Sequence, residues 1–96
     1  MYKVDINKKA QSHLKKTAFW YNAQQKGLGL RFLDEVENAI DILAINPFYA
    51  IRHRNVRGFN LKKFPYLVLY IVDENLSTIT ILAVFHTSQN PDKYPE

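Results

Sequence analysis

The strongest constraint on this 96-residue chain is an unbroken run of six apolar residues at positions 67–72. A strand with one buried face alternates apolar and polar residues. A run that is apolar throughout therefore predicts a central strand, with cover on both faces or with an interface on one of them. The polar segment 73–77 separates this run from a second β-rich run, 79–87. The two runs predict an antiparallel hairpin.

Two helices are predicted upstream of the hairpin. Residues 2–6 alternate as in a half-buried strand, and Asn7 suits a helix N-cap. Apolar residues then recur at three- and four-residue spacing over about 8–26 and again over about 30–45. Gly27 is a candidate stop for the first helix, and the Asn-Pro pair at 46–47 ends the second. The short link between them predicts an antiparallel helical hairpin.

The order of elements defines the expected fold class. Residues 48–56 read as a short strand or an extended connection, and 57–64 as a basic strand that ends in a Phe-Pro-Tyr corner. The resulting β-α-α-β-β-β order predicts an α+β fold, in which the N-terminal helical hairpin packs on one face of a mostly antiparallel sheet. A chain of this length supports one core, so we expect a single domain over 1–96.

The composition limits the cellular compartments and the catalytic or metal-binding chemistry that can be expected of this chain. The chain has no cysteine, which favours a reducing cytoplasm and excludes thiol catalysis and thiolate zinc sites. We see neither a signal peptide nor an apolar run long enough to span a membrane. No His, Asp or Glu spacing suggests a metal site, and the acids at 34, 35, 37 and 41 read as the solvated side of a helix. No cofactor is expected.

The net charge of +4 is unevenly distributed. No acid occurs between Ile42 and Val72, and five cations fall in that interval: Arg52, Arg54, Arg57, Lys62 and Lys63. They are candidates for holding an acidic protein segment or RNA, and the alternative is a solvated sheet edge whose lysines deter stray strand pairing. Arg57 is the best placed of them to bind a carboxylate bidentately.

Two further side chains are candidates for function. His86 ends the last strand and could act as a general base, but a structural histidine bonded to a neighbouring carbonyl is the favoured interpretation. Phe19, Trp20 and Tyr21 are consecutive on the first helix, so they cannot all face the core. We expect at least one of them, with Trp20 the candidate, to lie under a partner or the sheet edge.

The layout resembles the RelE/ParE superfamily of toxins from bacterial type II toxin–antitoxin modules. The resemblance covers nearly the whole chain. It rests on the helix segment at 32–40, the boundary at 43–47, the Val-Arg pair at 56–57, the corner segment 61–66, the Ala-Val-Phe-His-Thr segment at 83–87 and the Asn-Pro pair at 90–91. The corner and the closing segment are the more ParE-like. An arginine is often found in ParE-like chains where Ser88 and Gln89 stand here, so no role is carried over from it.

The superfamily implies two alternative activities. RelE-like members are ribosome-dependent mRNA endoribonucleases, and ParE-like members inhibit DNA gyrase. When the chain is aligned with the RelE nuclease pattern, Lys62 is a cation where the pattern has one. Asn60, Leu67 and Thr87 stand at the other positions where cations are expected. Tyr94 is the residue nearest to the expected tyrosine. The candidate catalytic residues under that alternative are Arg57, Lys62, His86 and Tyr94.

We therefore expect a ParE-like toxin that binds rather than cleaves. The resemblance implies growth inhibition through DNA gyrase, a role in plasmid stabilisation, and neutralisation by a cognate antitoxin that contacts Trp20 and the five cations. The alternatives are an mRNA endoribonuclease that acts at the ribosome and a non-toxic binding module.

Overall fold

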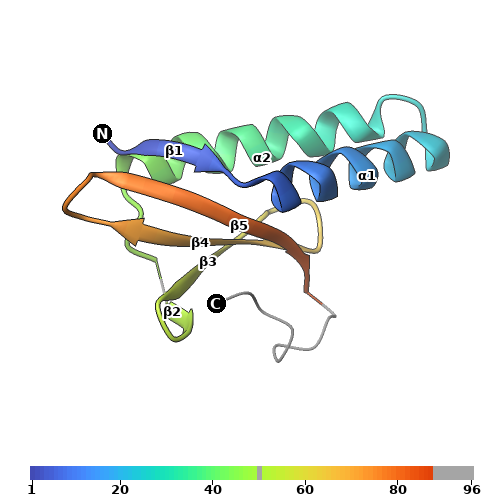
Figure 1. Ribbon diagram of the computed structural model, residues 1–96. Coiled ribbons are helices and arrows are strands. Elements are labelled where there is room, and N and C mark those ends of the chain that lie inside the picture. The colour runs from blue at the N-terminus through green and yellow to red at the C-terminus, as the bar shows by residue number, and fades with distance from the viewer. Residues whose placement is uncertain (50, 88–96) are drawn as a thin grey trace.

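In the computed structural model, two helices lie across one face of a five-stranded sheet (Figure 1). The structure describes residues 1–49 and 51–87. The expected α+β class and element order are confirmed, with four strands after the helices. The elements are β1 (Lys3–Ile6), α1 (Lys8–Gln24), α2 (Leu28–Ile45), β2 (Ile51–His53), β3 (Val56–Asn60), β4 (Tyr66–Asp73) and β5 (Thr78–His86).

The sheet is mixed, with the strand order β1-β5-β4-β3-β2. Neighbouring strands from β2 to β5 pair antiparallel as expected, and β4 with β5 forms the predicted hairpin. β1 adds one parallel pair at the β5 edge. This is possible because the helical hairpin brings the chain back to its start, where Tyr2 N donates to Ala44 O at 2.8 Å.

The two helices form the predicted hairpin with a short link, and their bounds differ by about two residues from those expected. Asn7 caps α1 as predicted, since its Oδ1 accepts from Ala10 N at 2.8 Å. Gly27 has a φ of 85°, but it precedes α2 as its N-cap, while α1 already ends at Gln24. A Cβ on Gly29 would lie 2.2 Å from Ala18 O, so only glycine allows the helices to approach this closely.

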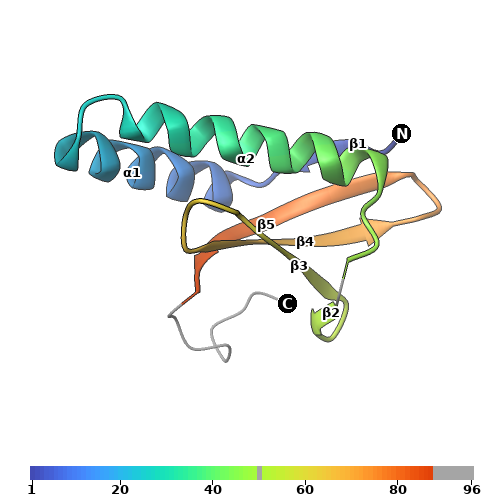
Figure 2. The same cartoon turned by 180° about the vertical axis from the view of Figure 1, so that it is seen from behind.

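β4 is buried on both faces, as its unbroken apolar run predicts. Val68 and Tyr70 face the helices, where they join a core that includes Phe32 and Leu43. On the other face, Leu67 packs in a second cluster with four more buried residues: Val56, Leu69, Ala83 and Phe85. Figure 2 shows both helices on the same side of the sheet.

A β-bulge in β5 sets the direction of its last residues. Leu69 pairs with Ala83, but the next residue of β4, Tyr70, pairs with Ile81, so Leu82 is the extra residue. The bulge reverses the alternation of side chains along the strand. Ile81 and Val84 consequently face the helices, and His86 follows on that same side.

The corner at 61–65 is tied to both layers. Leu61 N donates to Tyr66 O at 3.0 Å, and Thr87 N donates to Pro65 O at 2.9 Å. Glu35, expected on the solvated side of its helix, is half-buried and accepts from Lys63 N at 2.9 Å. A carboxylate that accepts a backbone N–H fixes the corner against α2.

Candidate functional site

Arg57 is directed into the molecule, away from the solvent at the sheet edge. It is half-buried, and its Nη1 donates to Tyr49 O at 2.5 Å. Its guanidinium also stacks over the Phe48 ring, with Cζ 5.4 Å from the centroid. Both contacts lie in the segment that links α2 to β2. Arg57 therefore holds this segment against β3 with a charge-assisted hydrogen bond and a cation–π contact.

Tyr70 lies beside Arg57 and fastens the same segment. The two residues are cross-strand partners, and the Tyr70 hydroxyl donates to Pro47 O at 2.7 Å. Tyr70 is fully buried. Burial raises the pKa of its phenol above the ordinary value of 10.0, although a hydrogen bond with the Tyr49 backbone and the positive charge of Arg57 act in the opposite direction. We call this arrangement of Tyr70, Arg57, Pro47, Phe48 and Tyr49 the loop clasp.

The remaining cations of the predicted basic edge are exposed. Arg52 lies across β3, where a Cβ on Gly58 would come within 2.8 Å of its Cγ. Arg54 is in a turn with a φ of 54°. Lys62 and Lys63 lie on the corner and line a hollow of about 360 Å³ beside α2.

His86 lies at the other end of the hairpin, in a hollow of about 560 Å³ between β5 and α1. Its ring meets Tyr66 edge-on, with the centroids 5.0 Å apart. Trp20 and Lys16 line the same hollow from the helix. Tyr21 lies between the layers, and burial together with the neighbouring Tyr66 raises the pKa of its phenol above 10.0. We call this the aromatic hollow.

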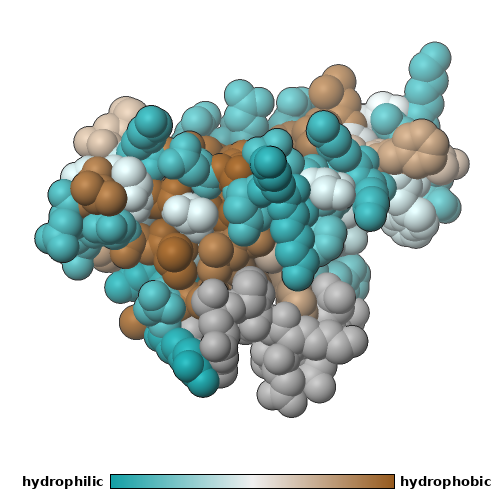
Figure 3. All heavy atoms as spheres, viewed as in Figure 1, coloured by the Kyte–Doolittle hydropathy of each residue, from teal (hydrophilic) through white to brown (hydrophobic). Residues whose placement is uncertain are grey.

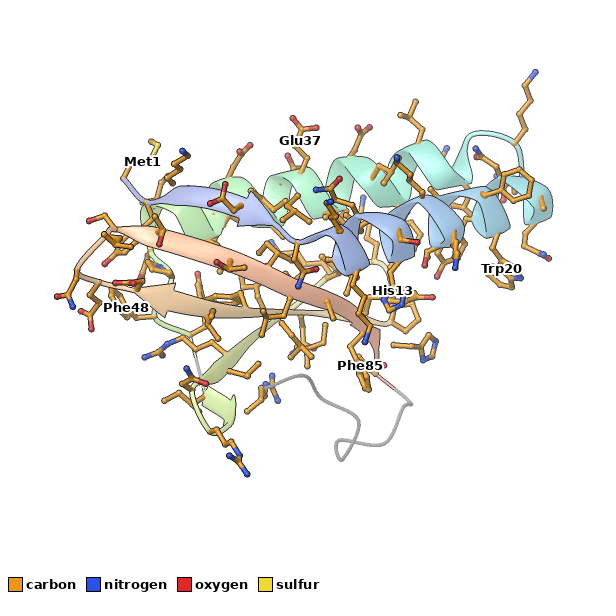
Figure 4. All side chains as sticks on the ribbon, in the orientation of Figure 1. Met1, His13, Trp20, Glu37, Phe48 and Phe85 are labelled. Carbon is orange, nitrogen blue, oxygen red and sulfur yellow. The ribbon has the colours of Figure 1, made fainter. Side chains whose placement is uncertain are left out.

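Trp20 is exposed, as expected for the member of the aromatic triplet that was assigned to a partner. Its exposed fraction is 55%, and that of Phe19 is 79%. Tyr21 turns inward, where its ring packs against Phe32 with the centroids 5.5 Å apart. Figure 4 shows Trp20 projecting from α1 on the side away from α2.

The described nuclease candidates lie at separate places. Arg57 pairs with Tyr70 and His86 pairs with Tyr66, four positions earlier on β4, which corresponds to about 13 Å along the strand. Lys62 lines a different hollow from His86. Tyr94 lies outside the described residues.

The other aligned positions add no cation to these. Asn60 and Thr87 are exposed, and Leu67 is buried in the second apolar cluster. Within residues 1–49 and 51–87, no group of three or more His, Asp or Glu side chains could hold a metal ion. None of the helices in these ranges is long and apolar enough to cross a membrane.

Comparison with known proteins assigns the family. The family model for the ParE toxin of the type II toxin–antitoxin system parDE matches residues 4–91. The chain belongs to the ParE toxin family. Its expected membership of the RelE/ParE superfamily is thereby confirmed. No curated protein sequence matches the chain significantly.

Solved structures share the fold of this ParE family member. One is from the chromosomal ParDE toxin–antitoxin system of P. aeruginosa, with a TM-score of 0.77 and 17% identity over 92% of this chain and 98% of that one. Another is from the intact E. coli RelBE toxin–antitoxin complex, with a TM-score of 0.71 and 14% identity over 93% of this chain and 100% of that one. At these identities the likeness shows a common fold.

Sequence reasoning missed the loop clasp. Arg57 and Tyr70 donate to backbone carbonyls in a segment without periodicity. Every residue has a backbone carbonyl, so the sequence does not show which of them accepts a side-chain hydrogen bond. One signal was available: a tyrosine inside an otherwise aliphatic buried strand needs a partner for its hydroxyl.

Proposed function

We propose that this ParE family member is the toxin of a type II toxin–antitoxin module, that it inhibits growth when free by binding DNA gyrase in the cytoplasm, and that a cognate antitoxin neutralises it. The family match and the likeness to the ParDE structure support this proposal. The observation that carries the choice of binding over cleavage is the position of Arg57. Its guanidinium holds the Tyr49 carbonyl and covers the Phe48 ring, so it does not project toward a bound phosphate.

Metal-free cleavage of RNA needs several cations around one phosphate, because the charge that develops in the transition state has no other counter-ion. Arg57, Lys62 and His86 are spread along the sheet and its corner, which favours a surface that recognises a protein. Arg52, Arg54, Lys62 and Lys63 are exposed and suit contacts with acidic groups. They remain part of the proposed partner surface.

The antitoxin proposal also accounts for how such a toxin is controlled. Antitoxin segments that fold only on binding are easily proteolysed while free. Loss of the antitoxin would release the toxin, and the module would thereby stabilise a plasmid or chromosomal region that encodes both partners. The ParDE and RelBE structures come from toxin–antitoxin systems, which supports an antitoxin partner.

One experiment separates the proposed activity from the nuclease alternative. The toxin is purified from its antitoxin complex and tested in a gyrase supercoiling assay and in an mRNA cleavage assay with programmed ribosomes. We expect loss of supercoiling with intact mRNA, and restoration of supercoiling when the antitoxin is added. Codon-dependent cuts with unaffected supercoiling would overturn the proposal.

Lys62→Ala provides a control inside the same experiment. If the chain were a nuclease that uses Lys62, this variant should lose about two orders of magnitude in cleavage rate. If the chain binds gyrase, no cleavage exists to be lost. Normal growth with both assays unaffected would favour the non-toxic binding module.

A further inference from the structure

The two helices carry opposite charges on the side of the molecule that faces away from the sheet. α1 has four lysines and no acid, whereas α2 has four acids and one arginine. Figure 4 shows Glu37 projecting from α2 away from the sheet, and Figure 3 shows mainly hydrophilic side chains, with a few hydrophobic ones among them, along this helical side. Among the residues that the structure describes, no ion pair joins the lysines of α1 to the acids of α2. Both sets of charges are therefore available to a partner.

Each helix presents part of this charge in one exposed row. The row of α1 follows a spacing of four, three and four residues, which keeps its members on one side of the helix, away from the buried Ala10 and Leu14. All its members are exposed: Lys8, Ser12, Lys15 and Phe19. The row of α2 has the same spacing and is also exposed throughout: Leu30, Asp34, Glu37 and Asp41. We call these eight residues the hairpin rows.

The two rows match one another turn by turn. Gly29 packs against α1 between Ala18 and Asn22, since a Cβ on Gly29 would lie 2.2 Å from Ala18 O and its N donates to Asn22 Oδ1 at 2.8 Å. The helices run antiparallel (Figure 1), so each step forward along α2 is level with an equal step back along α1. The level pairs are Phe19 with Leu30, Lys15 with Asp34, Ser12 with Glu37 and Lys8 with Asp41.

We propose that the hairpin rows are a self-association surface to which a second copy of this chain binds. A two-fold axis parallel to the helices lays α1 of each copy on α2 of the other and leaves the levels unchanged. Lysines then face carboxylates, and Phe19 faces Leu30, on both sides of the axis. The surface is thus complementary to itself in charge and in apolar contact. An axis across the helices would instead set the lysines of the two α1 helices against each other.

The area of this surface suits a weak and reversible dimer. α1 is 17 residues long. The face is therefore about 25 Å long, and two helices side by side make it about 20 Å wide. Two such faces bury about 1,000 Å² in total, which is close to the lower limit for a specific interface. The dimer should form at micromolar concentrations and weaken as salt is added. This inference goes beyond the proposed function, because it depends on neither gyrase nor an antitoxin.

The test reverses the charge of one row at a time and measures association by sedimentation velocity over a range of concentrations. Lys8→Glu with Lys15→Glu sets carboxylate against carboxylate at two levels. Asp34→Lys with Asp41→Lys sets lysine against lysine at the same levels. We expect each double variant alone to dimerise at least about tenfold more weakly than the native chain. Mixed in equal amounts, the two should form a heterodimer, because both levels again join opposite charges.

Matched controls separate the rows from the charge of the chain as a whole. Lys9→Glu with Lys16→Glu changes the net charge equally on the same helix but outside the row. It should leave self-association unchanged and should form no heterodimer with the variant whose α2 row is reversed. Phe19→Ser should weaken the dimer about tenfold. Leu76→Ser removes a similarly exposed apolar side chain from the turn between β4 and β5 and should have no effect. Circular dichroism verifies that each variant is folded.

The outcomes distinguish this inference from the proposed function. A native chain that stays monomeric at every concentration would overturn the inference, and so would a dimer that persists in both double variants or a mixture that forms no heterodimer. If the native chain stayed monomeric while the double variants lost antitoxin affinity, the face would belong to the antitoxin. A dimer formed by a chain that leaves gyrase supercoiling unaffected would overturn the proposed function and leave this inference intact.

Discussion

Two tyrosines of β4, one at its start and one near its middle, have opposite environments. Tyr70 is fully buried, its hydroxyl is bonded to Pro47 O, and Arg57 lies beside it. Four residues away, on the same face, Tyr66 is half-buried and meets His86 at the wall of an open hollow. The loop clasp closes one end of the sheet, while the aromatic hollow leaves the other accessible.

This difference shows that residue type alone is a poor guide to a docking surface. Arg57 is the strongest candidate in the sequence for binding a partner's carboxylate. In the structure, its guanidinium instead donates a hydrogen bond to the backbone of its own chain. The aromatic hollow contains fewer cations but has aromatic rings along its wall and open space between them. We therefore expect substitutions in the loop clasp to change stability, and substitutions beside the aromatic hollow to change binding.

The largest effect is expected from Tyr70→Phe. The change removes only the hydroxyl but leaves the Pro47 carbonyl without its buried donor, so the free energy of unfolding should fall by about 2 kcal/mol. Tyr66→Phe is the matched control at the open end, and we expect less than about 0.5 kcal/mol from it because the ring contacts remain. Urea denaturation of both variants measures the difference. Equal losses at the two ends would contradict the distinction between them.

Arg57→Met should have a somewhat smaller effect. Methionine keeps much of the apolar stem and loses the bond to Tyr49 O and the contact over Phe48, which should reduce the free energy of unfolding by about 1–1.5 kcal/mol. Thermal unfolding provides the measurement. We expect antitoxin affinity to fall by less than about threefold, since a half-buried side chain offers little to a partner. A large loss of antitoxin affinity without loss of stability would show that Arg57 contacts the antitoxin directly.

Alkaline pH should lower the free energy of unfolding through the buried phenol of Tyr70 in the loop clasp. The pKa of Tyr70 is raised in the folded protein, so its protonated phenol contributes stability that is fully present below the unfolded-state value of 10.0 and is lost as pH rises through the folded-state pKa. Stability measured upward from neutral pH should therefore decline above that value. Tyr70→Phe should show a shallower decline than the native chain, and an identical decline would assign the effect to other groups, such as Tyr21.

The fold was largely predictable because it follows from periodicity. The apolar run in β4, the stripes of α1 and α2 and the cap at Asn7 are local patterns with few alternatives. The parallel partner of β1 and the bulge at Leu82 were not predicted, since both depend on how distant segments meet. The bulge brings His86 to the same face as Tyr66.

The site was predictable only in part. The exposure of Trp20 agrees with a packing argument, since three consecutive rings on a helix cannot all be buried. Clustering of Lys and Arg in the sequence identified the basic edge, but it does not distinguish an exposed lysine from an arginine bonded to a backbone carbonyl. The difference between Lys62 and Arg57 is therefore visible only in three dimensions.

The smallest effect on stability is expected at the open end, from Trp20→Ser and His86→Gln. Trp20 is more than half exposed, with an exposed fraction of 55%, but its ring also meets that of Tyr21, so the free energy of unfolding of Trp20→Ser should fall by about 1 kcal/mol. His86→Gln keeps a polar side chain of similar length at the wall of the aromatic hollow and should be equally mild. Differential scanning calorimetry measures both. If either variant lost as much stability as Tyr70→Phe, the residues at the open end would be part of the core. The aromatic hollow would then not be a site for a partner's side chain.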